Sequence, residues 1–226
     1  MTWVEIEEKL KETQTVLIPI SSLEQHGHHL PISTDCVEGY EVAKKAAGET
    51  KVLLHPTIML GNQRKSYGYP GSISIKKSTL KSVVKEVCES LIFNGFKKLI
   101  FVSGHGGSNH LEAIQEAIDE MNNKNIKVIE LFETFSKLAE ELNESEHDGH
   151  AAESETSLML YLDPKNVKMK KAKAYAPKYP DDGTSEEFRK CNPIGVNGDP
   201  TKATKEKGKR LFEKAVEEVV KIVKNE

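Results

Sequence analysis

The chain has 226 residues, a formal net charge of −3, three widely spaced cysteines and a charged amino-terminal segment. This length suffices for one sizeable core, so we predict a single domain over residues 1–226, and the odd cysteine count without a signal peptide predicts a cytoplasmic protein. The small net charge excludes a protein-wide basic surface for nucleic acid, and no apolar run approaches the roughly 18 residues that cross a membrane.

Short apolar runs alternate with longer amphipathic segments along the first 132 residues. Near-continuous Val, Ile and Leu in short runs are typical of strands buried on both faces of a parallel sheet. The segments between them place apolar residues three and four apart, as amphipathic helices do. This alternation predicts a layered α/β fold. The predicted strands are residues 15–20, 51–59, 98–102 and 126–132, and the predicted helices are residues 37–47, 80–93 and 111–121.

The last third of the chain is less regular. A helix over residues 151–162 should end near Asp163, because the residue before a proline is disfavoured in the α conformation. Residues 165–200 hold several prolines and glycines with few apolar pairs, which predicts an extended excursion over the surface. Residues 201–223 have the apolar spacing of a final amphipathic helix.

The densest group of polar side chains follows the first predicted strand. Glu24 and His26 lie two residues apart, so their side chains share a face where the chain is extended. Ligands of open α/β sheets bind outside the carboxyl ends of the strands. Carboxylate and imidazole together suit zinc, manganese or ferrous iron. Asp35 is either a further ligand or a carboxylate that favours the start of the next helix, and the spacing leaves both readings open.

Two glycine-containing loops follow the second and third predicted strands. In residues 61–74, Tyr67 and Tyr69 either stack on a planar substrate or belong to a surface loop with one packed tyrosine. In residues 103–110, His105 lies among three glycines at a strand-to-helix turn, which favours a metal ligand beside the first cluster. Backbone amides at Gly106 and Gly107 are suited to an oxyanion. The phosphate-binding pattern G-x-x-x-x-G-K-[ST] is absent.

A last group of chemically useful residues opens the helix predicted at residues 151–162. Glu155 shares its face with Leu158 and Met159, so we expect it to be buried and bound either to a metal or to a buried Lys or Arg. Glu153 should face solvent or the mouth of the site. His150, just before the helix, is either a general acid or base or a histidine without a catalytic role.

Together these motifs resemble the creatininase family. The resemblance is carried by E-x-H-G-x-H-L-P-x-x-T-D at residues 24–35, Y-P-G-S-I at 69–73, G-H-G-G-x-N at 104–109, H-A-x-x-x-E-T-S at 150–157 and G-x-x-G-D-P at 195–200. It implies a three-layer α/β/α sandwich with a central, mainly parallel sheet. It also implies a homo-oligomer, for which a hexamer is one arrangement in the family.

The resemblance implies an enzyme that hydrolyses a non-peptide carbon–nitrogen bond of a small cyclic amide or formamide. Two divalent metal ions (Zn, Mn or Fe) would activate water, with Glu24 and His105 holding one ion, His26 the other and Asp35 bridging them. His150 would protonate the departing nitrogen.

Two departures from the family pattern bear on the substrate. Gly107 stands where creatininase has a metal-binding glutamate, and Glu155 is our candidate replacement. Ser66 stands near the place of a family histidine. Both departures count against creatinine as the substrate.

Three alternatives remain. One is a formamide deformylase that acts on a phosphorylated formylaminopyrimidine in flavin and deazaflavin synthesis, with Arg64 and Lys65 near the phosphate. Another is a peptide-processing hydrolase of redox-cofactor maturation. The third is a non-catalytic metal- or ligand-binding protein on the same fold.

Overall fold

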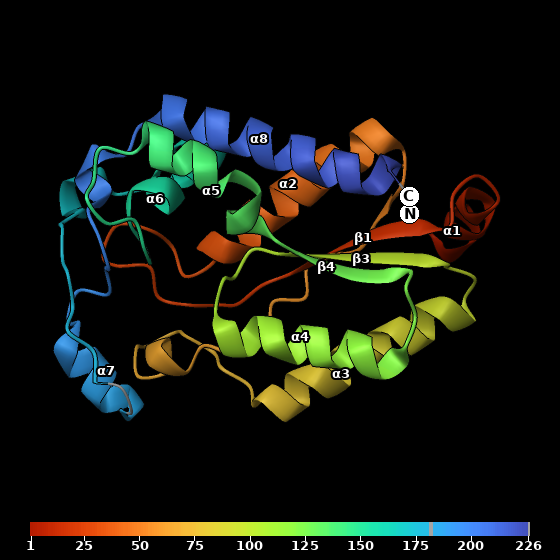
Figure 1. The fold of residues 1–226 in the computed structure, drawn as a ribbon, viewed down its shortest axis with the longest axis horizontal. Coiled ribbons are helices and arrows are strands. Elements are labelled where there is room, and N and C mark those ends of the chain that lie inside the picture. Colours follow the sequence, from red (N-terminus) through yellow and green to blue (C-terminus); the bar gives the residue numbers. More distant parts are fainter. Residues whose placement is uncertain (181–182, 226) are drawn as a thin grey trace.

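A four-stranded parallel sheet forms the centre of the computed structural model, which describes residues 1–180 and 183–225 (Figure 1). Its strand order is β2-β1-β3-β4. Strands β1 and β3 pair over their full length, from Thr15 opposite Lys98 to Ile20 opposite Ser103. The strands are β1 (Thr15–Ile20), β2 (Leu53–Leu54), β3 (Lys98–Ser103) and β4 (Ile126–Glu130).

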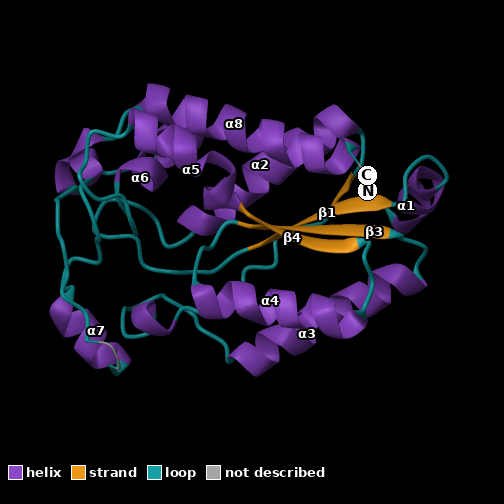
Figure 2. Cartoon of the chain, viewed as in Figure 1, coloured by secondary structure: helices purple, strands orange, loops and turns teal. Residues whose placement is uncertain are grey.

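Helices cover both faces of the sheet, which confirms the predicted three-layer α/β/α architecture (Figure 2). One face carries α2 (Thr34–Thr50), α5 (Leu131–Leu142), α6 (Glu153–Leu162) and α8 (Lys205–Lys224). The other carries α3 (Lys77–Phe93) and α4 (Ser108–Met121). Alternate side chains of β1 therefore enter different cores: Leu17 packs with the first helix group, whereas Val16 and Ile18 pack with the second.

Two predicted strands are shorter than expected. Only Leu53–Leu54 of residues 51–59 form a strand, and Pro56, which has no amide hydrogen for a ladder, follows closely. The last strand ends at Glu130 instead of residue 132, because the Glu130 carboxylate accepts hydrogen bonds from the amides of Phe132 and Glu133 and so begins α5. No glycine or proline marks this boundary, and the sequence analysis missed α5 for that reason.

Two further helices were missed, α1 (Trp3–Leu10) and α7 (Ser185–Cys191), the second within the excursion predicted at residues 165–200. Both begin with a capping box, formed by Thr2 with Glu5 and by Thr184 with Glu187. The T-x-x-E spacing was thus the available signal. The remaining short turns of helix are η1 (Arg64–Ser66), η2 (Met169–Lys171) and η3 (Pro200–Lys202).

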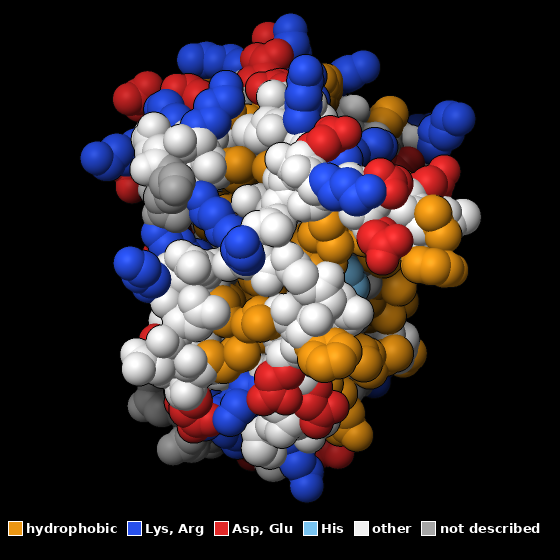
Figure 3. Space-filling view, turned by 90° about the vertical axis from the view of Figure 1, so that its right-hand side faces the viewer, with side chains coloured by type: hydrophobic (Ala, Val, Ile, Leu, Met, Phe, Trp, Pro, Cys, Tyr) orange, Lys and Arg blue, Asp and Glu red, His pale blue; other side chains and the backbone are white. Residues whose placement is uncertain are grey.

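The two ends of the sheet differ in character. The carboxyl ends of the strands open toward long connecting loops (Figure 2). At the opposite end, hydrophobic side chains gather on the surface (Figure 3), and Trp3 and Phe93 there are 75% and 90% exposed. None of the helices in the described part of the chain has the length and apolar character needed to cross a membrane.

Candidate metal centre

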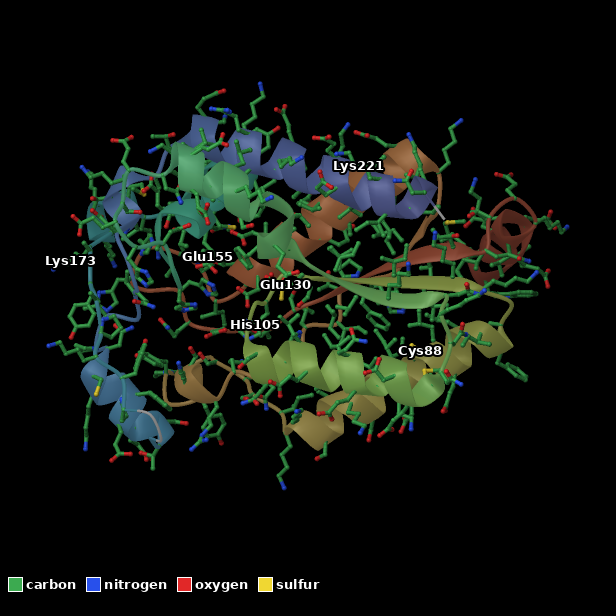
Figure 4. The ribbon with its side chains drawn as sticks, in the orientation of Figure 1. Cys88, His105, Glu130, Glu155, Lys173 and Lys221 are labelled. Atoms are coloured by element: carbon green, nitrogen blue, oxygen red, sulfur yellow. The ribbon has the colours of Figure 1, made fainter. Side chains whose placement is uncertain are left out.

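The side chains singled out in the sequence converge at the carboxyl ends of β1 and β3. Glu24 and His26 follow β1, His105 follows β3, Asp35 lies in the first turn of α2, and Glu155 lies in the first turn of α6. His105 and Glu155 both lie on the loop-rich side of the sheet (Figure 4). All five are nearly inaccessible to solvent. Neighbouring parallel strands thus bring together residues that are far apart in the chain.

One group of possible metal ligands consists of Glu24, Asp35 and His105. Nδ1 of His105 lies 2.9 Å from Asp35 Oδ2 and 3.0 Å from Glu24 Oε2. The Ser22 hydroxyl donates a hydrogen bond to Asp35 Oδ2 at 2.7 Å, and the Ser66 hydroxyl donates one to Glu24 Oε1. These two serines fix the orientation of both carboxylates, which is the support that metal-binding carboxylates need.

A second group consists of His26, His150 and Glu155. Nε2 of His26 lies 2.9 Å from Asp35 Oδ1 and 3.6 Å from Glu155 Oε1. Asp35 therefore faces His105 with one oxygen and His26 with the other, and it lies between the two groups. The Asp35 carboxylate thus presents one oxygen to each group.

Local backbone geometry holds the second group in place. Nδ1 of His26 lies 3.0 Å from the Glu24 carbonyl oxygen, which can only accept, so Nδ1 carries a hydrogen and Nε2 is the ring nitrogen that faces the carboxylates. The Ala151 amide donates a hydrogen bond to Glu155 Oε2. Ala151 has a φ of 55°, an unfavourable conformation for a residue with a Cβ atom, and it lies directly between His150 and α6. The turn that leads from His150 into α6 is therefore held in a strained conformation.

The electrostatics of the site favour ionised carboxylates. Burial by itself raises the pKa of a carboxyl, yet His105 and His150 lower the pKa of Glu24 to about 2. Similarly, burial opposes charge on His105, but Glu24 and Asp35 raise its pKa to about 10. Glu24 and Asp35 thus require compensating positive charge.

The donor atoms fit divalent metal ions. Carboxylate oxygen and imidazole nitrogen are ligands for zinc, manganese and iron. Among the described residues, the buried Nε2 of His26 has no partner with hydrogen-bond geometry, although Asp35 and Glu155 lie close to it. Ligand atoms that lie close together without forming a hydrogen bond are expected where they point toward a shared metal ion.

Gln25, which the sequence analysis did not select, positions His150. Nε2 of His150 lies 2.6 Å from the Gln25 carbonyl oxygen and 2.9 Å from Gln25 Nε2. Oε1 of Gln25 accepts a hydrogen bond from the Gly27 amide at 3.0 Å. Gly195 makes room for this side chain, because a Cβ atom there would lie 1.8 Å from Gln25 Oε1. No sequence pattern links residues 25 and 195, so only the fold could reveal this support.

A cavity of about 970 Å³ opens onto the two groups. Tyr69, Gly106, Gly107 and His150 line it. Tyr67 does not line the cavity and is 62% exposed, so the structure gives it no place in a substrate site. The predicted excursion contributes Tyr179 to the wall instead.

Asn192 is a second residue that sequence reasoning missed. Its carbonyl oxygen accepts a hydrogen bond from the Tyr69 hydroxyl at 2.5 Å, and its Nδ2 donates one to the Tyr179 hydroxyl at 2.8 Å. Its Oδ1 accepts from the amides of Gly195 and Val196. A single buried residue therefore holds both tyrosines of the cavity wall, Tyr69 through its backbone carbonyl and Tyr179 through its side chain.

The prediction that Glu153 faces solvent or the mouth of the site is wrong. Glu153 is fully buried, and its carboxylate accepts hydrogen bonds from the amides of Glu144 and Ser145 and from Lys207 Nζ at 2.6 Å. Lys207 reaches it from α8, which the helical pattern of α6 alone does not reveal. The buried Lys–Glu pair considered for Glu155 thus belongs to Glu153, while Glu155 faces His26.

Comparison with known proteins agrees with these positions. The family described as Creatininase, creatinine amidohydrolase, matches residues 1–223. The chain belongs to the creatininase family. A mycofactocin precursor peptide peptidase of Mycobacterium ulcerans is 30% identical over 223 residues, with 91% of this chain and 83% of that protein aligned. The creatinine amidohydrolase of Pseudomonas putida is 28% identical over 247 residues, covering 100% and 95%.

The fold also resembles that of solved creatininases. A creatininase solved in a Zn–Zn form superposes with a TM-score of 0.86 at 24% identity, over 100% of this chain and 95% of that one. This member of the creatininase family therefore has the hydrolase fold of its relatives and two residue groups that can hold metal ions.

The family departure at Gly107 has a local explanation. A Cβ atom on Gly107 would lie 2.4 Å from His105 Nε2, so the turn packs directly against the imidazole ring. A larger side chain at position 107 would therefore require the His105 ring to shift. Glu155 of α6 is, after Asp35, the second acid that faces His26.

Proposed function

We propose that this protein is a divalent-metal-dependent hydrolase that cleaves a carbon–nitrogen bond of an amide. The observation that carries the proposal is the pair of residue groups that meet at Asp35 on the floor of a cavity of about 970 Å³. Glu24, Asp35 and His105 would hold one ion, and His26, Asp35 and Glu155 the other. When bound, such ions acidify water and polarise a carbonyl oxygen.

The protein's own residues supply the remaining chemistry. His150, oriented by Gln25, would give a proton to the departing nitrogen, a role that histidine commonly fills. Leu111 and Phe132 line the same cavity and would limit access of bulk water. The alternative assignment of His150 as a metal ligand is tested by the metal content of a His150 variant.

The type of amide is a further part of the proposal. A cyclic amide or formamide of a small molecule is the first candidate, in keeping with the resemblance to creatinine amidohydrolase. A peptide-like amide is the second. It is favoured by the cavity, which lies at the upper end of the usual range of about 300–1,000 Å³ for ligand sites, and by the similarity to a peptide peptidase.

The formamide deformylase alternative depended on Arg64 and Lys65. Arg64 donates a hydrogen bond to the Gly183 carbonyl oxygen and does not line the cavity, whereas Lys65 does line it. A homo-oligomer stays a prediction from the sequence.

The proposal is tested by measuring metal content and turnover in the same samples. Elemental analysis of wild type should give close to two divalent ions per chain, and Glu155→Gln should lower this toward one. Glu133→Gln is the matched control, because Glu133 lines the cavity but belongs to neither group. A panel of cyclic amides, formamides and short peptides is then screened with each metal. Reproducible failure to bind zinc, manganese or iron would overturn the proposal.

A further inference from the structure

One wall of the cavity is formed by two segments that are distant in sequence. The helical turn η1 packs against α7, and the Ser185 hydroxyl donates a hydrogen bond to the Arg64 carbonyl oxygen at 2.9 Å. Arg189 donates a hydrogen bond to the Gly68 carbonyl oxygen at 3.0 Å. This wall places Lys65 and Tyr179 next to each other.

Lys65 is held over aromatic rings on this wall. Its ammonium nitrogen lies 4.9 Å from the centre of the Tyr179 ring and 5.7 Å from that of Phe188. The two rings meet edge to face at 5.5 Å. Within the described part of the chain Lys65 has no ion-pair partner. A cation–π contact orients the ammonium group, and no carboxylate among the described residues forms an ion pair with it.

Tyr179 adds a hydrogen-bond donor beside this charge. Its hydroxyl oxygen accepts a hydrogen bond from Asn192 Nδ2 at 2.8 Å, which leaves the hydroxyl hydrogen available. Burial raises the pKa of Tyr179, so the group stays protonated and able to donate. An ammonium and a phenol on one wall are suited to an anionic acceptor.

The rest of the cavity has the opposite charge. Lys65 is the sole Lys or Arg among the described residues that line the cavity, whereas Glu133 and Glu140 of α5 and Glu146 lie on its lining. An anionic group is therefore repelled by these acids and attracted to Lys65. The next residue, Ser66, donates a hydrogen bond to Glu24, so this wall directly adjoins the metal centre.

We propose that Lys65 and Tyr179 form a specificity subsite that binds an anionic group, carboxylate or phosphate, close to the scissile amide of the substrate. The proposal rests on the hydrolase function proposed above. The subsite selects acidic amides over neutral ones of the same shape.

The test compares three amides that differ in one group: N-formylglycine, neutral N-formylglycinamide and N-formylaminomethylphosphonate. Binding to the metal-loaded protein is measured by calorimetry, and turnover is followed separately. We expect the better anionic compound to bind roughly tenfold more tightly than the neutral one, as befits a charge-assisted hydrogen bond. The ranking of carboxylate against phosphonate identifies the anion that the subsite prefers.

Three variants test whether the preference for anionic compounds depends on Lys65 and Tyr179. Lys65→Met keeps an apolar stem over the rings and should abolish the preference, and Tyr179→Phe should reduce it several-fold. Lys178→Met is the matched control, because Lys178 is exposed and does not line the cavity. It should leave the preference unchanged.

The outcomes separate this inference from the proposed function. A preference that survives Lys65→Met, or equal binding of the neutral compound, would overturn the subsite even if amides are hydrolysed. A preference that depends on Lys65 without any hydrolysis would support the subsite and count against the hydrolase.

Discussion

Replacing Gly208 by alanine tests how closely α8 packs on the helix that carries Glu155. Gly208 lies in the first turns of α8, and a Cβ atom there would lie 1.8 Å from the Ser157 carbonyl oxygen and 2.9 Å from the Leu158 amide nitrogen. These are backbone atoms of α6, which cannot rotate away. Accommodating the methyl group therefore requires the two helices to separate.

Two effects of opposite sign determine how Gly208→Ala changes the free energy of unfolding. Overpacking of this severity costs about 3 kcal/mol. Alanine gains about 1 kcal/mol over glycine within a helix. The free energy of unfolding of Gly208→Ala should therefore fall by about 2 kcal/mol. Ser157 is two residues from Glu155, so the displaced helix should also weaken metal binding.

Gly48→Ala is the matched control in another helix. Gly48 lies in α2, is exposed, and has no atom within 4 Å of a Cβ placed on it. Only the propensity effect remains, so the free energy of unfolding should rise by about 0.5–1 kcal/mol. Equilibrium urea unfolding of both variants measures the difference. If Gly208→Ala is as stable as Gly48→Ala, the packing argument is refuted.

Three further substitutions test the site and its support. His150→Ala should retain metal but lose about 10²- to 10⁴-fold in kcat; loss of metal would instead make His150 a ligand. Asn192→Ala should raise KM more than it lowers kcat, because the Tyr179 hydroxyl loses the side-chain amide that holds it, whereas Tyr69 keeps its bond to the backbone carbonyl. Loss of Oδ1 leaves the Val196 amide unpaired and should cost about 1–3 kcal/mol of unfolding free energy; unchanged KM would contradict the positioning role. Glu38→Leu should raise the unfolding free energy by about 1–3 kcal/mol, since both carboxyl oxygens are buried without a hydrogen-bond partner in the part of the chain that the structure describes; a destabilised variant would show that Glu38 has a partner in solution.

Much of the site was predictable because its main residues follow strand ends. Glu24, His26 and His105 come directly after β1 and β3, and parallel strands bring their carboxyl ends to one edge of the sheet. The burial of Glu155 followed from its position on the apolar face of α6. These inferences needed only local periodicity and the topology of an α/β sheet.

The remaining parts depend on contacts between distant segments. Lys207 reaches Glu153 from α8, and Asn192 joins Tyr69 to Tyr179, without any periodic pattern that would signal either contact. The start of α5 was missed for a local reason, since Glu130 ends a strand and caps a helix in the same residue. Sequence reasoning therefore located the floor of the cavity better than its wall.

The wall anchored by Asn192 has a consequence for the proposed substrate choice. The groups that can hold metal come from residues 24–155, whereas residues 172–197 supply Tyr179, Asn192 and the glycine that accommodates Gln25. Substitutions at Tyr179 can therefore alter the cavity wall without replacing any side chain of the two groups that can hold metal. Under the proposed function, such substitutions would change which amide the cavity accepts and leave the chemistry of its floor intact.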